Sequence, residues 1–368
     1  MTLRKTAPVA ALTAAVIATS FGPQAWAGGH GIDLSGKTVE WVIPFSETGG
    51  SAKWANFYAP LLSEALPGEP TVVVKFMPGA GSTKGANWFQ QQSYDDSEGT
   101  LIFGSSGSTQ FPYLLGDPRV RYEYADWSVV LASGTGGVAY LAPDLAAQMD
   151  GMDASALADT DFIYGSQGAT RLDLVPLLAW EMLGLNVEPV FGIKGRGDGR
   201  LMFERGEANI DYQTSSSYLK GVTPLVEAGT AVPMMSWGAL DADGNVVRDP
   251  TFPDMPTCKE VCAATAGCDT SGEKWDAWKA FLVAGFPAQK MVFLPAGASN
   301  DAIVTYTKAF EDVKARADFA EISGARLGKY PQMTGDEATG ALNSATSVPD
   351  AAKTFVTTWL MDRYGVSL

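Results

Sequence analysis

Short apolar runs alternate with amphipathic stretches along the first third of the chain. The apolar runs are Val39–Phe45, Thr71–Phe76 and Thr100–Phe103, and their length and β-branched content predict buried strands. Between them, Ser51–Leu66 carries apolar residues at the i, i+3, i+4 spacing of an amphipathic helix. Ser82–Gln92 predicts a second helix. This β-α-β-α-β order predicts a mostly parallel sheet with helices on both faces.

The alternation restarts after about residue 132. Strands are predicted over Val138–Ala142, Asp161–Tyr164, Val187–Phe191, Asn209–Gln213 and Val232–Trp237, and helices over Arg171–Leu183, Gly199–Arg205 and Ser217–Ala228. A hairpin turn is expected at Asp241–Asn245, an irregular insertion at Asp249–Trp275, a strand-like segment at Phe281–Leu294, and helices over Asn300–Lys314, Thr334–Asn343 and Pro349–Asp362. The expected fold is α/β, with two lobes and a crevice at the carboxyl ends of the strands.

Glycine-rich, hydroxyl-rich loops follow several of the predicted strands. They are Ser46–Ser51, Pro78–Ser82, Gly104–Ser108 and Gly165–Thr170, and a helical pattern follows three of the four. A strand that turns directly into a helix leaves the first backbone N–H groups without partners, where the helix dipole adds positive charge. Several such helix ends in one crevice would bind an anion without a metal or a basic cluster. The loops therefore predict a receptor for a carboxylate or another oxyanion.

The N-terminal segment has the features of a cleaved export signal. Arg4 and Lys5 precede the apolar stretch Ala7–Ala18, and Ala25-Trp26-Ala27 is a small-x-small cleavage site. The apolar stretch is too short to span a bilayer. A retained membrane anchor is the alternative. We predict cleavage after Ala27, so that residues 1–27 are a signal peptide and the mature chain is exported.

Charge and composition restrict the possible partners. The chain has 26 Lys+Arg and 41 Asp+Glu residues, a net charge of −15, and loss of Arg4 and Lys5 with the signal would make it −17. Such an acidic chain is a poor nucleic-acid binder, because neutralising phosphates needs a basic surface. At 46 % hydrophobic residues the chain is able to bury a large core, and its length suggests two domains.

All three cysteines, Cys258, Cys262 and Cys268, lie in one short segment. An oxidising compartment favours one disulfide that closes a small loop onto Cys268 and leaves one thiol over. Zinc binding is the alternative, but no histidine lies nearby to complete four ligands. We expect the disulfide, and neither a bound metal nor a cofactor.

An ordered set of motifs resembles the substrate-binding proteins of tripartite tricarboxylate transporters, also called Bug receptors. The motifs are Val42–Phe45 running into Gly49–Ser51, Pro78–Gly81, Tyr164–Gly168, Lys194-Gly195, Arg205–Asp211, Pro253–Thr257 and Leu294–Ser299. They occur in order from about residue 38 to about residue 360. Each motif alone is weak, whereas the ordered set is fairly specific.

The resemblance implies a type II periplasmic-binding-protein fold in which two lobes close on a ligand. Chain crossings near residues 132 and 250 would give a discontinuous first lobe, 28–131 plus 251–368, and a second lobe, 132–250. The resemblance also implies delivery of a small carboxylate to the permease subunits of a membrane transporter. We expect a periplasmic monomer with no nucleic-acid partner.

The resemblance further implies that ligand carboxylates lie against backbone N–H groups and hydroxyls of the loops. Carried over to this sequence, the first lobe would offer Phe45, Ser46, Thr48, Gly49, Gly50, Ser51, Gly79, Ala80, Gly81, Ser82, Ser105 and Ser106. The second lobe would offer Ser166, Gln167, Gly168, Ala169, Thr170, Lys194, Gly195, Thr214 and Ser215.

Two charged residues depart from the family pattern. Glu47 lies in the first loop, where the pattern usually has a neutral residue, and it points either to solvent or to a donor on the ligand or a cation. Arg171 begins a predicted helix beside the fourth loop, where a guanidinium could hold a distal carboxylate through two hydrogen bonds. The alternative for Arg171 is a surface ion pair with Asp173 or another acid.

The sequence does not favour an enzyme. The only histidine is His30, close to the predicted cleavage site, so a Ser-His-acid triad would lack its base. Phosphate-binding and dinucleotide-binding glycine motifs are absent. A periplasmic sensory receptor that presents a bound carboxylate to a membrane signalling protein is the main alternative to a transport role, and a periplasmic hydrolase is a remote one.

Overall fold

The computed structural model describes residues 1–2 and 31–368, so most of the predicted signal peptide lies outside the described residues, as does His30. Gly31–Leu368 forms one compact unit. Within that range, none of the helices combines the length and the apolar character that are needed to cross a bilayer.

The largest sheet has six strands in the order β13-β4-β12-β3-β1-β2. Their bounds are β1 Thr38–Ile43, β2 Thr71–Phe76, β3 Leu101–Ser106, β4 Ser128–Ser133, β12 Lys290–Leu294 and β13 Gln332–Met333. Strand β1 runs parallel to β2 and β3, whereas β12 runs antiparallel to β3 and β4, and β13 antiparallel to β4. The predicted parallel pairing is confirmed for the first three strands, and the prediction of a mostly parallel sheet was wrong for the sheet as a whole. The sheet is mixed, because β12 arrives from a distant part of the chain and inserts between β3 and β4 in the opposite direction.

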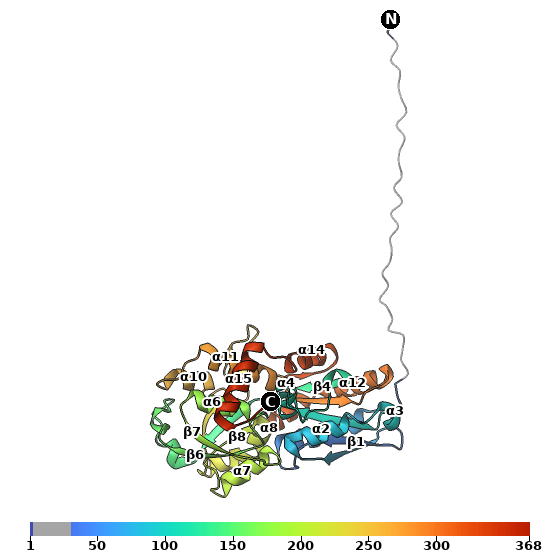
Figure 1. The fold of residues 1–368 in the computed structure, drawn as a ribbon. Coiled ribbons are helices and arrows are strands. Elements are labelled where there is room, and N and C mark those ends of the chain that lie inside the picture. Colours follow the sequence, from blue (N-terminus) through green and yellow to red (C-terminus); the bar gives the residue numbers. More distant parts are fainter. Residues whose placement is uncertain (3–30) are drawn as a thin grey trace. The chain divides into compact units, whose positions relative to one another are not determined.

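Alternate residues of β1 supply the two faces of this sheet. Trp41 and Ile43 pack into one core with Trp54 and Phe310, so helices α1 (Gly50–Ala65) and α12 (Asn300–Lys314) cover that face. Val42 packs into the opposite core, where α2 (Thr83–Phe89) and α14 (Gly335–Ala345) cover the sheet. This two-sided burial explains why β1 is a nearly continuous apolar run. The predicted helices on both faces are confirmed (Figure 1).

The middle of the chain forms smaller sheets. Strands β8 (Ile210–Thr214), β5 (Gly137–Leu141) and β9 (Val232–Ser236) form an antiparallel sheet, and β6 (Asp161–Ser166) pairs in parallel with β7 (Asn186–Phe191). The predicted hairpin at Asp241–Asn245 joins β10 (Ala239–Leu240) to β11 (Val246–Val247). The helices here are α6 Leu174–Met182, α7 Arg196–Glu204, α8 Ser215–Ser217, the π-helical stretch η4 Tyr218–Val222 and α9 Thr223–Glu227.

The segment that was expected to be an irregular insertion is partly helical. It holds α10 (Cys258–Ala264) and the start of α11 (Gly272–Gly285), so the prediction for Asp249–Trp275 was wrong. The prediction that Phe281–Leu294 is strand-like was also wrong over its first half. Phe281 and Leu282 belong to α11, where they continue the helical spacing set by Trp278, and the strand begins only at Lys290.

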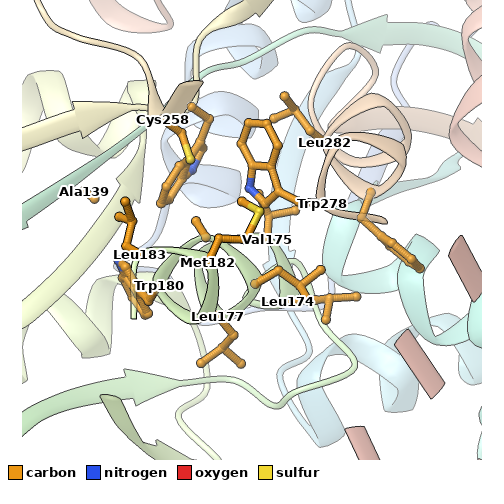
Figure 2. Close-up of a cluster of buried hydrophobic side chains, with 14 of the residues drawn as sticks. Ala139, Leu174, Val175, Leu177, Trp180, Met182, Leu183, Cys258, Trp278 and Leu282 are labelled. Atoms are coloured by element: carbon orange, nitrogen blue, oxygen red, sulfur yellow. The ribbon is translucent and has the colours of Figure 1, made fainter. Parts of the chain in front are cut away.

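A buried cluster joins α6, α10 and α11. Figure 2 shows Trp278 and Leu282 of α11 facing the apolar side chains of α6, with Cys258 beside them. Cys262 and Cys268 form a disulfide, and Cys258 is a buried free thiol. The expected disulfide onto Cys268 with one thiol left over is confirmed.

The C-terminal helix α15 (Asp350–Tyr364) lies beside α11, which also contacts α6 (Figure 1). The division into lobes 28–131 plus 251–368 and 132–250 stays a prediction, because α11 and α15 of the first range share a core with α6 of the second. The remaining elements are α3 Tyr94–Ser97, α4 Gly107–Leu115, α5 Pro143–Ala146, α13 Phe319–Arg326, η1 Ala80–Ser82, η2 Tyr124–Asp126 and η3 Ser155–Leu157.

Candidate functional site

A small cavity lies where loops from the six-stranded sheet meet loops from the middle of the chain. Its volume is about 30 Å³, and we call it the cleft. Eight predicted site residues line it, and they come from five separate loops: Phe45, Gly49, Gly50, Ser51, Ser106, Gln167, Gly195 and Thr214. Residues far apart in the sequence therefore meet at one point, as the loop pattern predicts.

Two helices begin at the cleft without a capping side chain. Gly49 is the N-cap of α1 and Gly195 is the N-cap of α7, and at neither helix start does a backbone N–H donate to an N-cap side chain. Their first backbone N–H groups are therefore left for a ligand or water, with the positive ends of both helix dipoles behind them. This pair of open helix ends is suited to bind an anion.

The first loop, Ser46–Gly50, contacts the start of α7 directly. The backbone N–H of Ser46 donates to the carbonyl of Lys194 at 3.3 Å, and Oγ1 of Thr48 donates to Oδ1 of Asp198 at 3.1 Å. A Cβ atom on Gly197 would lie less than 3.0 Å from the backbone of Thr48, so a side chain there would separate the two loops. The glycines allow this close approach.

The third and fourth loops are joined by hydroxyl and amide hydrogen bonds. Oγ of Ser108 donates to Oε1 of Gln167 at 3.3 Å and accepts from the backbone N–H of Leu172 at 3.2 Å. The other end of the Gln167 amide, Nε2, is buried and has no hydrogen-bond partner in the described chain. Because Gln167 lines the cleft, this free donor is available to a ligand oxygen.

Arg196, the first residue of α7, is buried rather than free to bind a ligand. Its guanidinium pairs with Asp211 and lies 3.5 Å from Oδ2 of Asp173, between the rings of Tyr164 and Tyr212. Burial opposes its charge, but Asp211 and the other partners outweigh burial, so the pKa of Arg196 stays well above its ordinary value. This ion pair fixes the start of α7 against β8.

Comparison with known proteins gives a match in structure alone. No family model matches the chain, and no curated protein matches its sequence. MatC from Rhodopseudomonas palustris with bound malate is 16 % identical, with a TM-score of 0.62 over 86 % of this chain and 98 % of that one. The periplasmic binding protein BugD is 19 % identical, with a TM-score of 0.62 over 90 % of this chain and 98 % of its own. A second R. palustris protein, with adipate, is 15 % identical, with a TM-score of 0.64 over 87 % of this chain and 96 % of its own.

The chain has the type II periplasmic-binding-protein fold. The structural neighbours are periplasmic binding proteins of the Bug and TctC type, as the sequence motifs indicate. The likeness extends over most of the described chain.

In this binding-protein fold, eight more of the predicted residues line a second, larger cavity of about 540 Å³. They are Gly79, Ala80, Gly81, Gly168, Ala169, Thr170, Arg171 and Lys194, and Gln167 lines both cavities. Thr48 lines a third cavity instead. The other five predicted residues line none of these cavities: Ser46, Ser82, Ser105, Ser166 and Ser215.

Arg171 is buried, with 2 % of its surface exposed. Its Nη2 donates to the carbonyl of Ala80 at 2.9 Å and lies 3.8 Å from Oδ2 of Asp117. The predicted alternative was a surface pair with Asp173 or another acid. Arg171 does pair with another acid, Asp117, but the pair is buried rather than on the surface, because the side chain turns inward to the second loop. Nη1 of Arg171 has no hydrogen-bond partner in the described part of the chain. The side chain also borders the larger cavity, so a role in holding a ligand stays a prediction.

Four cleft residues were not predicted: Ser108, Leu172, Arg196 and Gln289. Ser108 lies in the predicted third loop, although it was not among the residues carried over from the family. Leu172 and Arg196 directly follow the predicted residues Arg171 and Gly195, so wider windows would have included them. Gln289 precedes β12, which reaches the cleft only because that strand inserts beside β3. No local sequence pattern signals this insertion.

Proposed function

We propose that this protein is a periplasmic solute-binding protein of the tripartite tricarboxylate transporter type. It captures a small carboxylate between two lobes and delivers it to the permease subunits in the membrane. The observation that carries the proposal is the convergence of two uncapped helix starts, at Gly49 and Gly195, on one cleft. Backbone N–H groups at such helix ends match the acceptor oxygens of a carboxylate.

The chemistry of the cleft supports a carboxylate over other small ligands. Its polar groups are backbone N–H groups, hydroxyls of Ser51, Ser106 and Thr214, and the free amide donor of Gln167. Structural neighbours with malate and adipate make dicarboxylates the first ligands to test. We propose binding without catalysis, because the sequence offers no histidine base near these hydroxyls.

Binding requires the cleft to open. A volume of about 30 Å³ is enough for one or two waters but not for a dicarboxylate. The lobes must therefore separate to admit the ligand and then close on it, and the ligand shifts this equilibrium toward the closed form. Asp249, Tyr330 and Ser215 are joined by hydrogen bonds of 2.6 to 2.9 Å beside the connection between β4 and β5, where such a hinge would bend.

A calorimetric screen of residues 28–368 against malate, adipate, citrate and aromatic acids tests the proposal. Binding of one carboxylate class with a micromolar or tighter Kd supports the proposal. If no carboxylate binds after co-purified ligand has been removed, the proposal is contradicted. Turnover of esters or amides by the purified protein would instead favour a hydrolase. Membrane vesicles that contain the permease should take up the identified ligand only when this protein is added. Uptake that proceeds equally well without the protein would favour a sensory role.

Export is tested by recovering the protein from the periplasmic fraction and sequencing its N-terminus. The proposal expects Gly28 as the first residue. Retention of residues 1–27 in the membrane fraction would instead show that the segment is an anchor.

A further inference from the structure

A third cavity, of about 640 Å³, lies on the other side of the first loop from the cleft. Glu47 and Thr48 of that loop line this cavity, whereas Gly49 and Gly50 line the cleft. Its walls come from α1, α7, η4 and α13, and we call it the basic groove. The volume is within the range of sites for small molecules.

Four cations line the basic groove: Lys53, Arg200, Lys220 and Arg326. Glu47 is the one acid among the lining residues, and it is exposed. Arg200 is paired with Glu204, but in the described chain neither Lys220 nor Arg326 forms a salt bridge. The chain as a whole carries a net charge of −15, so this local excess of positive charge is opposite to the charge of the molecule.

The cations repel one another across the groove. Lys53 donates to the carbonyl of Thr48 at 2.9 Å and to Oγ of Ser217 at 3.1 Å, which holds its ammonium at the wall. Burial, with additional repulsion from Arg200 and Lys220, lowers the pKa of Lys53 to about 8. Glu47 and Arg326 are the other charged groups that line the groove. Glu204 pairs with Arg200 and Glu47 is the one lining acid, so the four lining cations keep an excess of positive charge around Lys53.

We propose that the basic groove is a second anion site, which takes a small polyvalent oxyanion such as a di- or tricarboxylate or inorganic phosphate. Lys53 of α1, Arg200 of α7, Lys220 of η4 and Arg326 of α13 would hold the anion between them. The site is separate from the cleft. An anion here bridges α1 to η4 and α7, so it favours the arrangement in which Lys53 of α1 contacts Ser217 of α8.

Calorimetry with inorganic phosphate and with citrate tests the site. Lys220→Gln combined with Arg326→Gln removes two exposed cations and should weaken binding of both anions at least tenfold, and added salt should weaken it in the parent. Lys259→Gln, at an exposed position of α10 away from all the cavities described above, is the matched control and should leave the affinity unchanged. Equal affinity in the double variant and the parent would overturn the proposal, as would no binding by the parent.

Gln167→Ala separates this site from the cleft. It removes the free amide donor from the cleft and lies outside the groove, so phosphate should bind the Gln167→Ala protein as it binds the parent. Loss of phosphate binding in Gln167→Ala with retention in the double variant would place the anion in the cleft and overturn the proposal. If carboxylates fail to bind the cleft while phosphate still depends on Lys220 and Arg326, the proposed function fails and this inference stands.

Proton uptake gives a second readout. Sulfate is the probe for this readout, because its own charge does not change between pH 6 and pH 8, unlike that of phosphate or citrate. Sulfate beside Lys53 raises the pKa of Lys53 from about 8, so binding at pH 8 should take up a fraction of a proton, and the measured heat should depend on the ionisation enthalpy of the buffer. At pH 6, where Lys53 is already charged, that dependence should vanish. A buffer-independent heat at pH 8 would show that the anion binds away from Lys53.

Discussion

A Cβ atom on Gly50 would lie less than 3.0 Å from Oγ1 of Thr214, closer than real Cβ atoms approach their neighbours. Gly50 begins α1 and Thr214 ends β8, so the two residues belong to the two sides of the cleft. The cleft closes to this extent only because residue 50 has no side chain.

Gly50→Ala should therefore weaken carboxylate binding about tenfold, and Gly50→Asp about a hundredfold, because aspartate adds negative charge to the steric block (~1.4 and ~2.7 kcal/mol). Calorimetry with the ligand identified in the screen measures both. Thr214→Ala in the Gly50→Ala background should restore part of the affinity. Gly340→Ala, on α14 with open space around it, is the control for the added methyl group. Unchanged affinity in Gly50→Asp would exclude the first loop from the site.

Arg171→Ala should lower the affinity for dicarboxylates about tenfold and change the affinity for monocarboxylates little. The reason is that the guanidinium borders the larger cavity and that, in the described chain, its Nη1 has no hydrogen-bond partner. Competition titrations with adipate, a dicarboxylate, and hexanoate, a monocarboxylate, measure the loss of affinity for each ligand. Arg119→Ala is a suitable control, since Arg119 lines the same cavity and pairs with the same Asp117 but is largely exposed. Equal losses for both ligands would show that Arg171 acts by supporting the second loop through Ala80.

The cysteines make a prediction for thiol counting. The unfolded, unreduced protein should contain one reactive thiol, Cys258, and the native protein none, because burial raises the pKa of that thiol and hides it from reagents. Replacing Cys262 and Cys268 together by serine should lower the free energy of unfolding by about 2 kcal/mol, since the closed loop is short. Cys258→Ala should leave no thiol in the unreduced protein. Three thiols would exclude the disulfide.

Lys290 predicts a pH dependence of stability. Its side chain is buried in β12, where its ammonium donates to Oε1 of Gln289, and burial lowers its pKa from 10.5 to about 7. Between these two values the unfolded chain binds more protons than the folded one, so stability rises with pH across that window. Below pH 7 the ammonium of Lys290 is charged in the folded protein too, so the full free-energy cost of burying that charge lowers the stability.

Lys290→Met should therefore stabilise the protein at pH 6 by about 2–4 kcal/mol and have little effect at pH 10. Guanidinium unfolding at both pH values measures this difference. Lys259→Met, at an exposed position, should show no such dependence. An equal change at the two pH values would mean that Lys290 is solvated in the folded state.

Much of the local structure could be predicted from the sequence. The apolar run at Val39–Phe45 and the amphipathic stretch after it correspond to β1 and α1, because two-sided and one-sided burial impose different spacings of apolar residues. Prediction failed at Phe281–Leu294, where apolar residues on both sides of Gln289 and Lys290 span the end of a helix and the start of a strand. Such a stretch has no period that separates the two structures.

The sequence by itself determined that a helix would follow the glycine-rich loop after the first strand, and that one disulfide would leave one thiol over. These are properties of neighbouring residues. The sequence pattern placed the start of α7 at Gly199, whereas that helix begins at Arg196 with Gly195 as its N-cap. Only the tertiary structure decided that both helix starts meet in one cleft, that Gln289 joins them, and that Arg171 turns to Asp117 and Ala80 rather than to Asp173. Those outcomes depend on where β12 inserts into the sheet and on which loops then come into contact, and contacts between distant segments leave no periodic pattern in the chain.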